Sequence, residues 1–324
     1  MRQPLHPDLA RWGHLPDLEY RGSNEWSSSC PQCGGAKGGH DKSDRFRMFI
    51  ASGGKNARGW CRRCGYFSWA DDGAKIDPAK IVEAEIIRRE YMLLEHERIT
   101  QKIKELERAA FWRGYHEAMT EQQRQLWRDV GIDNYLIDYY KLGYTSDKPY
   151  LFAGDEYHSP AMTIPHYGPS WHLTNVQYRL ITPEPGAGKY RMTAGIPAAM
   201  FITEPDEPIK GPCLLMEGAK KAIVTYQNIG NQHLTIVSVP SSSPQVEMLE
   251  QLKGCDPVYV CLDPDAYTPA AKGMKPAVNR LARHLGKERV RIVNLPVKAD
   301  DLFVLHGGTA QDFQQFIRHA RAAA

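Results

Sequence analysis

Two pairs of cysteines near the start of the sequence limit what this 324-residue chain can fold into. Cys30 and Cys33 form one C-x-x-C pair, and Cys61 and Cys64 form the other. A glycine follows each pair and tolerates the tight turn that brings two thiolates and nearby N–H groups toward one ion. Four sulfur ligands suit one tetrahedral zinc ion, so we expect zinc here. This holds whether the zinc only allows a small domain to fold or also has a functional role.

The segment between the two cysteine pairs has the pattern of a β-ribbon. Residues 45–50 alternate in the manner of a strand, and residues 59–60 lead into the second pair. The glycine-rich stretches at 34–39 and 52–59 make the spacing longer than is usual for a ribbon. His40 lies in this loop, but with four cysteines available we expect it to be a solvated residue and not a ligand.

Basic and aromatic residues are interleaved in the same region. Residues 1–70 contain eleven Lys and Arg against six Asp and Glu, whereas the whole chain has a net charge of only +3. The interleaved residues are Arg45, Arg47, Arg58, Arg62 and Arg63 with Phe46, Phe49, Trp60, Phe67 and Trp69. Guanidinium groups can hold phosphates while aromatic rings stack on unpaired bases, although some of these rings must form the small core. We predict contact with single-stranded DNA, with Arg45, Arg62, Arg63 and Trp69 as the candidate residues.

A charged, helix-forming stretch follows from Pro78. Its apolar residues fall in two helical stripes: Ile87, Tyr91 and Leu94, then Ile99, Ile103, Leu106 and Ala110. Because the stripes are out of phase, we expect a broken helix or one shared between two faces, and not a long coiled coil. Thr120 can cap a further helix, so residues 121–143 are expected to open the second domain as a compact helical element.

Strand-like runs with acidic ends dominate the last third of the sequence. They occupy residues 213–216, 258–262 and 290–295, and residues 234–239 supply another strand. Helical patterns at 219–227 and 269–285 separate them. This alternation predicts a parallel, Rossmann-like α/β sheet.

Carboxylates stand where these strands end. Glu217 follows the first run, Asp263 and Asp265 follow the second, and Asp300 and Asp301 follow the third. Ligands of such sheets gather beyond the carboxyl ends of the strands, so we expect Glu217, Asp263 and Asp265 to share Mg²⁺ or Mn²⁺. Asp300 and Asp301 are candidates for a second or looser site. One ion can activate a 3′-hydroxyl while another neutralises a triphosphate, which indicates nucleotidyl transfer.

Taken in order, these segments resemble DnaG-type and bacteriophage-type DNA primases with an N-terminal zinc ribbon and a TOPRIM domain. The acidic segments look like TOPRIM, which type IA and II topoisomerases, OLD-type nucleases and RecR-type recombination proteins share. Residues 30–71 are similar to the primase zinc ribbon, and residues 126–144 are similar to the element that opens the primase polymerase domain. Residues 175–180 and 188–191 resemble the basic segment that precedes TOPRIM in these enzymes.

The resemblance implies an α/β fold in four parts. These are a zinc-ribbon template-binding domain at 1–75, a helical linker at 76–120, the N-terminal part of the polymerase core at 121–210, and TOPRIM with a C-terminal helix at 211–324. It also implies a DNA primase, a DNA-directed RNA polymerase that makes short primers from NTPs on single-stranded DNA, with Mg²⁺ or Mn²⁺ at Glu217, Asp263 and Asp265. Because the sequence has no G-x-x-x-x-G-K-[ST] motif, a replicative helicase partner would be a separate chain.

Two groups of basic residues leave alternatives open. Arg179, Lys189 and Arg191 either hold template or nucleotide phosphates or are surface residues of a hairpin. Lys220 and Lys221 follow Glu217-Gly218, where the sequence departs from the family pattern, and they either bind phosphates or solvate a helix. A second departure is the sequence D-P-D-A-Y at 263–267, in place of the usual D-G-D-x-A-G.

Two other functions fit parts of the pattern. A TOPRIM nuclease would cleave DNA with metal but without NTPs, whereas a non-catalytic replication or recombination factor would only bind DNA. A topoisomerase needs a tyrosine on a further DNA-gate domain, for which we find no segment. The first residues lack an apolar signal sequence and no run is long enough to span a membrane, so we expect a cytoplasmic protein. Residues 313–324 are predicted to form one terminal helix.

Overall fold

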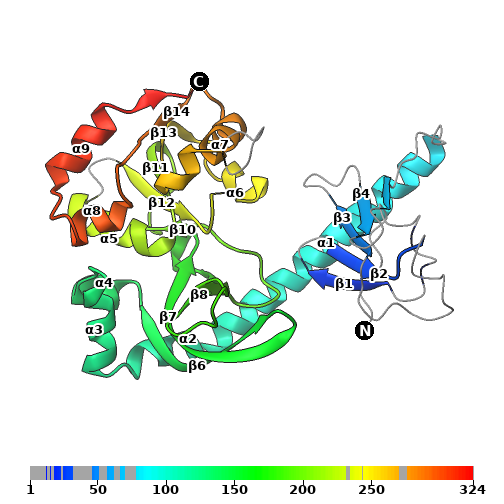
Figure 1. Ribbon diagram of the computed structural model, residues 1–324, viewed down its shortest axis with the longest axis horizontal. Helices are drawn as coiled ribbons and strands as arrows, with labels where there is room; N and C mark the ends of the chain where they lie inside the picture. The colour runs from blue at the N-terminus through cyan, green and yellow to red at the C-terminus, as the bar shows by residue number, and fades with distance from the viewer. Residues whose placement is uncertain are drawn as a thin grey trace. The chain divides into compact units, whose positions relative to one another are not determined.

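The computed structural model describes two compact units, residues 1–101 and residues 102–324 (Figure 1). The positions that it describes are 12, 15, 18–22, 25–31, 46–50, 57–61, 66–69, 78–230, 234–242, 244–269 and 276–323. Among these residues, no helix has both the length and the apolar character that a membrane span requires.

The first unit contains an antiparallel sheet whose strands pair in chain order. The strands are β1 (Glu19–Gly22), β2 (Glu25–Ser28), β3 (Phe46–Ile50), β4 (Ala57–Cys61) and β5 (Phe67–Trp69). Alternate residues of β3 are buried, as the sequence pattern predicts, and Phe46 and Met48 pack with Trp12 and Trp26 in a small core. Gly59 lies against this core so closely that a Cβ atom there would come within 2.2 Å of the Phe46 ring.

The helical linker is a single helix, α1 (Pro78–Ala109), of 32 residues. The prediction of a broken helix is therefore wrong. The other alternative, one helix with apolar residues on two faces, agrees with the structure. Its last turns belong to the second unit, where Ile103 and Leu106 pack in a core with strand residues. The helical conformation is interrupted at Ala110, which has a φ of 51° and precedes α2 (Phe111–Glu117).

Two short helices, α3 (Glu121–Asp129) and α4 (Asn134–Tyr139), follow as predicted. Thr120 caps α3, because its hydroxyl accepts the Gln123 N–H while the Gln123 side chain accepts the Thr120 N–H. Gly131 connects the helices with a φ of +90°, and a Cβ atom there would lie 2.3 Å from the Val304 side chain. The left-handed conformation and the close contact with Val304 both require glycine at this turn between the two helices.

A four-stranded antiparallel sheet comes next, again in chain order. Its strands are β6 (Gly143–Phe152), β7 (Asp155–Tyr167), β8 (Leu173–Leu180) and β9 (Tyr190–Met192), and the 3₁₀ turn η2 (Pro169–Trp171) links β7 to β8. Only the β8–β9 hairpin has a counterpart in the sequence prediction. The two long strands before it were missed.

The last part of the chain forms the predicted Rossmann-like sheet with helices on both faces. The strand order is β10-β12-β11-β13-β14-β15. The central strands β12 (Thr235–Val239), β11 (Gly211–Glu217), β13 (Cys255–Cys261) and β14 (Val290–Ile292) are parallel. The edge strands β10 (Phe201–Ile202) and β15 (Arg321–Ala322) are antiparallel, so the sheet is mixed and not wholly parallel.

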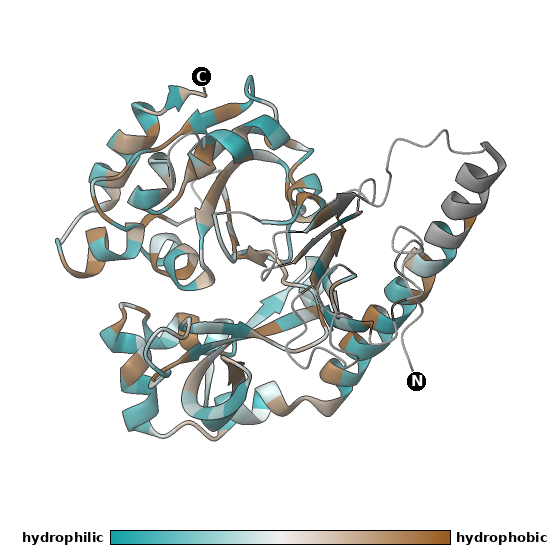
Figure 2. Cartoon of the chain, turned by 45° about the vertical axis from the view of Figure 1, so that its right-hand side comes forward, coloured by the Kyte–Doolittle hydropathy of each residue, from teal (hydrophilic) through white to brown (hydrophobic). Residues whose placement is uncertain are grey.

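Alternate residues of β11 enter two separate cores. Leu214 and Met216 pack with α5 (Ala219–Ile229), α8 (Ala299–Val304) and α9 (Ala310–Arg318), whereas Cys213 and Leu215 pack with α6 (Val246–Glu250) and α7 (Ala277–Leu285). In Figure 2 the helices around this sheet carry both hydrophobic and hydrophilic colour. The predicted terminal helix is correct only up to Arg318, because residues 321–322 pair with β14.

Candidate active site

Three carboxylates gather at one edge of the mixed sheet. Glu217 is the last residue of β11, Asp263 lies two residues beyond β13, and Asp265 lies in the 3₁₀ turn η3 (Pro264–Tyr267). Strands β11 and β13 are parallel neighbours in which Met216 pairs with Cys261, so both chains leave the sheet at the same level. Burial raises the pKa of Glu217, and the negative charges of Asp263 and Asp265 raise it further. The predicted trio is therefore close enough for mutual repulsion.

The backbone after each strand holds the acids in place. Gly218 has a φ of +86° and turns the chain from β11 into α5, while its N–H donates to the Val239 carbonyl at 2.8 Å. A side chain would strain this turn. The N–H of Ser242 donates to the Glu217 carboxylate and opposes the rise of its pKa.

Tyr267 fixes the loop that carries the two aspartates. Its hydroxyl donates to the Val293 carbonyl at 2.6 Å and accepts the Leu262 N–H at 3.1 Å. Burial raises the pKa of Tyr267, so the hydroxyl stays protonated and remains a donor. The sequence shows this residue only as a departure from a family pattern, and its role in holding the loop was missed.

The two lysines that follow Glu217-Gly218 both pair with carboxylates. Lys221 Nζ lies 2.5 Å from Asp263 Oδ1, and Lys298 Nζ lies 3.8 Å from Asp263 Oδ2. Lys220 forms an ion pair with Asp300 at the start of α8. The side chains of Lys220 and Lys221 are only 17% and 15% exposed, so they do not form a solvated helix face.

The acidic edge offers oxygen ligands, which suit a hard divalent cation. Within the described ranges, no group of three or more His, Cys, Asp or Glu side chains is already arranged around a metal position. The ammonium group of Lys221 lies against Asp263 and supplies positive charge there. Asp300 is 3% exposed, and its Oδ1 has no hydrogen-bond partner in the described part of the chain. The donor set fits Mg²⁺ or Mn²⁺ in chemistry. Asp301 follows Asp300 in the first turn of α8.

In the first unit, two of the four predicted zinc ligands are described. Cys30 follows β2, Cys61 ends β4, and both are buried in the core of the sheet. The N–H of Cys61 donates to the Tyr66 carbonyl at 2.8 Å. Cys33 and Cys64 lie outside the described residues, so the complete ligand set stays a prediction.

One face of the same sheet carries aromatic rings and a guanidinium group. Phe49, Arg58, Trp60 and Phe67 line a hollow of about 270 Å³. Trp60 and Phe67 are 45% and 47% exposed, which is unusual for large apolar side chains in a unit with so small a core. The predicted contacts Arg45, Arg62 and Arg63 lie outside the described residues, as does the side chain of Trp69.

The basic residues predicted from the β8–β9 segment lie on the antiparallel sheet. Arg179 donates to the Met162 sulfur at 3.1 Å, and Arg191 donates to the Gly188 carbonyl at 2.7 Å and lies over the Tyr150 ring. Lys189 is exposed in the loop, where its carbonyl accepts the Leu180 N–H at 2.7 Å. Within the described residues these side chains make contacts inside their own sheet and none with Glu217, Asp263 or Asp265. Their role toward phosphates stays a prediction.

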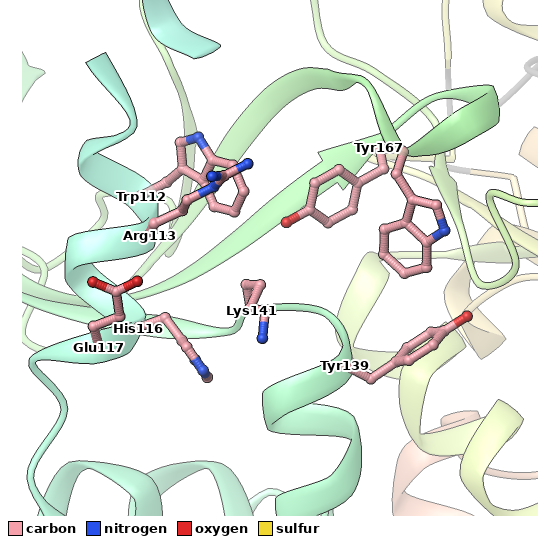
Figure 3. A pocket seen from close by; sticks show the side chains of 8 residues that line it. Trp112, Arg113, His116, Glu117, Tyr139, Lys141 and Tyr167 are labelled. Carbon is pink, nitrogen blue, oxygen red and sulfur yellow. The ribbon is translucent and has the colours of Figure 1, made fainter. Parts of the chain in front are cut away.

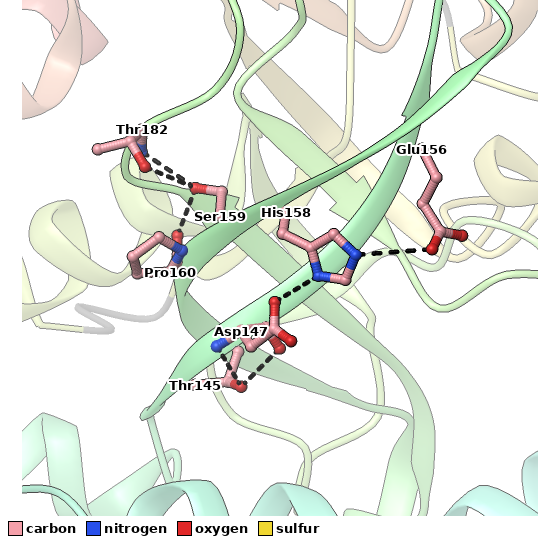
Figure 4. Close-up of polar contacts among 7 residues, drawn as sticks. All are labelled: Thr145, Asp147, Glu156, His158, Ser159, Pro160 and Thr182. Carbon is pink, nitrogen blue, oxygen red and sulfur yellow. Dashed lines mark hydrogen bonds and ion pairs between the residues drawn. The ribbon is translucent and has the colours of Figure 1, made fainter.

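A serine, a histidine and an aspartate also meet on β6 and β7, but they do not form a nucleophilic triad (Figure 4). His158 Nδ1 lies 2.7 Å from an Asp147 oxygen. The Ser159 hydroxyl instead donates to the Pro160 carbonyl at 2.8 Å and lies 3.3 Å from the Thr182 hydroxyl. Because neighbouring strand residues point to opposite faces, His158 cannot act as the base for Ser159.

Comparison of the sequence with protein-family models gave no match, and comparison with curated protein sequences gave none. Comparison with solved structures did. The zinc-binding and RNA polymerase domains of the Aquifex aeolicus primase match 98% of this chain and 84% of their own, with 14% identity and a TM-score of 0.50. The DnaG primase catalytic domain bound to single-stranded DNA matches 71% of this chain and 84% of its own, with 14% identity and a TM-score of 0.53.

The RNA polymerase domain of the Mycobacterium tuberculosis primase DnaG gives a similar result, covering 66% of this chain and 82% of its own at 12% identity and a TM-score of 0.50. At these identities the likeness concerns the fold. It extends from the small antiparallel sheet through the acidic edge of the mixed sheet. The chain therefore has the fold of a DnaG-type primase, spanning the zinc-binding and RNA polymerase domains.

Proposed function

We propose that this protein is a DNA primase, which synthesises short primers from NTPs on single-stranded DNA by metal-dependent nucleotidyl transfer. The observation that carries the proposal is the convergence of Glu217, Asp263 and Asp265 at the ends of adjacent parallel strands, in a chain with the fold of a primase core. Clustered carboxylates repel one another, and they are favourable only when positive charge is shared among them.

Glu217, Asp263 and Asp265 would hold Mg²⁺ or Mn²⁺, with Asp300 and Asp301 near a second position. When bound, such ions supply charge neutralisation for the triphosphate and activation of the attacking 3′-hydroxyl. The chain itself orients the acids: Tyr267 holds the loop of Asp263 and Asp265, and Ser242 holds Glu217. Lys221 keeps one oxygen of Asp263 paired, which limits how that carboxylate can rotate.

The first unit would bind the template. Cys30 and Cys61, together with Cys33 and Cys64, would hold one zinc ion that completes the small core. The face formed by Phe49, Arg58, Trp60 and Phe67 offers rings for stacking and a guanidinium group for phosphate, which suits an unpaired strand. Arg179, Lys189 and Arg191 on the β8–β9 hairpin would contact template or nucleotide phosphates, and a replicative helicase would be a partner.

The test is incorporation of labelled NTPs on single-stranded DNA of random sequence with Mg²⁺ or Mn²⁺. Asp263→Asn should reduce product at least a hundredfold, because it removes a charge that the reaction needs. Asp155→Asn, on an exposed residue at the start of β7, is the matched control and should retain full activity.

Two outcomes would redirect the assignment. Metal-dependent cleavage of DNA without NTPs, lost in Asp263→Asn, would identify a TOPRIM-type nuclease. Binding of DNA with neither synthesis nor cleavage under any of these conditions would leave a non-catalytic replication or recombination factor.

A further inference from the structure

A hollow in the second unit is lined by aromatic rings and cationic side chains (Figure 3). It has a volume of about 490 Å³, within the range of pockets for small ligands. The residues that matter are Trp112 and Arg113 of α2, Tyr139 of α4, Lys141 after α4, Tyr167 of β7 and Trp171 of η2. Glu217, Asp263 and Asp265 are not among the residues that line it, so the acidic edge does not form this hollow.

The aromatic rings form a continuous wall. The Tyr167 ring lies 5.7 Å from Trp112 and 5.0 Å from Trp171, and the Trp171 ring lies 4.9 Å from Tyr139. Trp112 is 4% exposed, and its Nε1 has no hydrogen-bond partner among the described residues. Burial raises the pKa of both Tyr139 and Tyr167, so their hydroxyl groups remain protonated donors at neutral pH. The wall thus combines π faces with unused hydrogen-bonding capacity.

Two cations stand beside this wall. The Arg113 guanidinium lies 5.0 Å from the centre of the Trp112 ring, and Figure 3 shows the Tyr167 hydroxyl directed toward the same side. Arg113 and Lys141 are exposed, and neither forms an ion pair within the described part of the chain. His116 is engaged elsewhere, because its nitrogens lie 2.6 Å from the Leu142 carbonyl and 3.3 Å from Asp138. Glu117 is the acid in the lining, against the two available cations.

Three residues around the hollow have an unfavourable backbone conformation. Lys141, Ser170 and Trp171 have φ values of 54°, 60° and 59°, in the left-handed region that disfavours residues with a side chain. Surrounding structure holds them, since the Ser170 N–H donates to the Pro205 carbonyl at 2.8 Å and Trp171 packs between two tyrosines. Backbone strain of this kind, at two of the residues that line the hollow, is typical of binding sites.

We propose that this hollow binds one nucleotide unit, with the base against the Trp171 and Tyr139 rings and the phosphate between Arg113 and Lys141. An apolar ligand would leave the two cations unpaired, and a simple anion would make no stacking contact with the four rings. Stacking plus a phosphate contact is the chemistry by which proteins hold unpaired nucleotides. The unit can belong to a single strand or be a free nucleotide. The inference does not require polymerase activity, because the hollow contains none of the proposed metal ligands.

The experiment compares the wild-type chain with the double variant Arg113→Gln/Lys141→Gly, in which glycine suits the backbone of position 141. Binding of a fluorescein-labelled dT12 is measured by anisotropy, and binding of labelled AMP is measured by equilibrium dialysis. Arg283→Gln/Lys287→Gln, at exposed positions in α7 and just after it, removes the same two charges and is the control. A thermal melt of each variant confirms folding.

If the unit belongs to a strand, the double variant should bind dT12 about tenfold more weakly, and Trp171→Gly should weaken binding of dT12 more than binding of an abasic strand of equal length. If the unit is a free nucleotide, AMP binding should fall about tenfold while dT12 binding is unchanged. Unchanged binding of both ligands by a folded double variant would overturn the inference. The loss of NTP incorporation expected in Asp263→Asn tests the proposed function, whereas the double variant tests this hollow.

Discussion

The two units place their proposed metal ligands in opposite relations to their hydrophobic cores. In the first unit, Cys30 and Cys61 are themselves core residues, buried with Phe46 and Met48. In the second unit, Glu217, Asp263 and Asp265 lie at the rim of a sheet whose two apolar cores are complete without them. A metal should therefore be part of the fold in the first unit and part of the chemistry alone in the second.

The largest expected effect is loss of the first unit on removal of zinc. Small zinc modules draw about 10 kcal/mol or more from the metal, which exceeds what so small a core supplies. Cys61→Ser, or chelation of the native chain, should abolish amide protection in β3 and β4 while leaving β11 and β13 protected, as measured by hydrogen exchange. Protected β3 and β4 in the zinc-free chain would remove the distinction between the units. Cys213→Ser, in the second unit, is the matched control.

A smaller loss of stability is expected when the loop that carries Asp263 and Asp265 loses its contact with the core of the second unit. Tyr267→Phe deletes the hydroxyl that donates to the Val293 carbonyl and accepts the Leu262 N–H. Leaving buried backbone groups unpaired should lower the free energy of unfolding by about 1–3 kcal/mol, as measured with urea. NTP incorporation should fall more than stability alone explains, because the Asp263 loop loses its anchor. Tyr135→Phe, on an exposed ring, should change neither quantity.

Lys221 allows a more selective test of the acidic edge. Lys221→Met removes the ammonium group from Asp263 and leaves that carboxylate for a cation, so Mn²⁺ should bind several-fold more tightly. The same change removes a charge that lowers the pKa of Glu217, so Mn²⁺ binding should be lost at a higher pH than in the wild type. Metal titrations across pH measure both effects, with Lys210→Met as the control. Weaker binding in Lys221→Met would mean that this lysine supports the metal site instead of competing with it.

The smallest effect concerns an exposed pair, His158 and Asp147, on the antiparallel sheet. The His158 ring donates a hydrogen bond to the Asp147 carboxylate, and this bond, aided by the charge of Asp147, raises the pKa of His158 above its ordinary value. The folded state therefore gains stability that is complete below the histidine pKa of an unfolded chain, about 6.5, and lost as pH rises through the folded pKa. Asp147→Asn should lower the pKa of His158 in an NMR titration and reduce stability slightly, only on the acidic side. A pKa that does not move would show that the pair is not formed.

What could be predicted from the sequence follows from how local each signal is. Strands β11 and β13 and their acids were found because an apolar run followed by a carboxylate is a contiguous pattern. Strands β10 and β15 were missed because two residues carry no periodicity. The Lys221–Asp263 pair joins residues 42 positions apart, and no sequence spacing indicates it.

The aromatic hollow is even harder to predict from the sequence. Its lining comes from α2, the end of α4, β7 and η2, and each of these segments taken alone resembles an ordinary surface or core stretch. Most tyrosines and tryptophans between 112 and 171 are buried or half-buried, as ordinary core residues are. Only the tertiary structure places Arg113 and Lys141 beside them.

The most direct test of the central claim is Mn²⁺ binding, followed by electron paramagnetic resonance, in the wild-type chain, Asp265→Asn and the control Asp155→Asn. We predict saturable binding that Mg²⁺ displaces, retained in Asp155→Asn and weakened at least tenfold in Asp265→Asn, with loss of NTP incorporation in the same variant. Equal Mn²⁺ affinity in all three proteins would contradict the account, because the acidic edge would then not be where a catalytic metal binds.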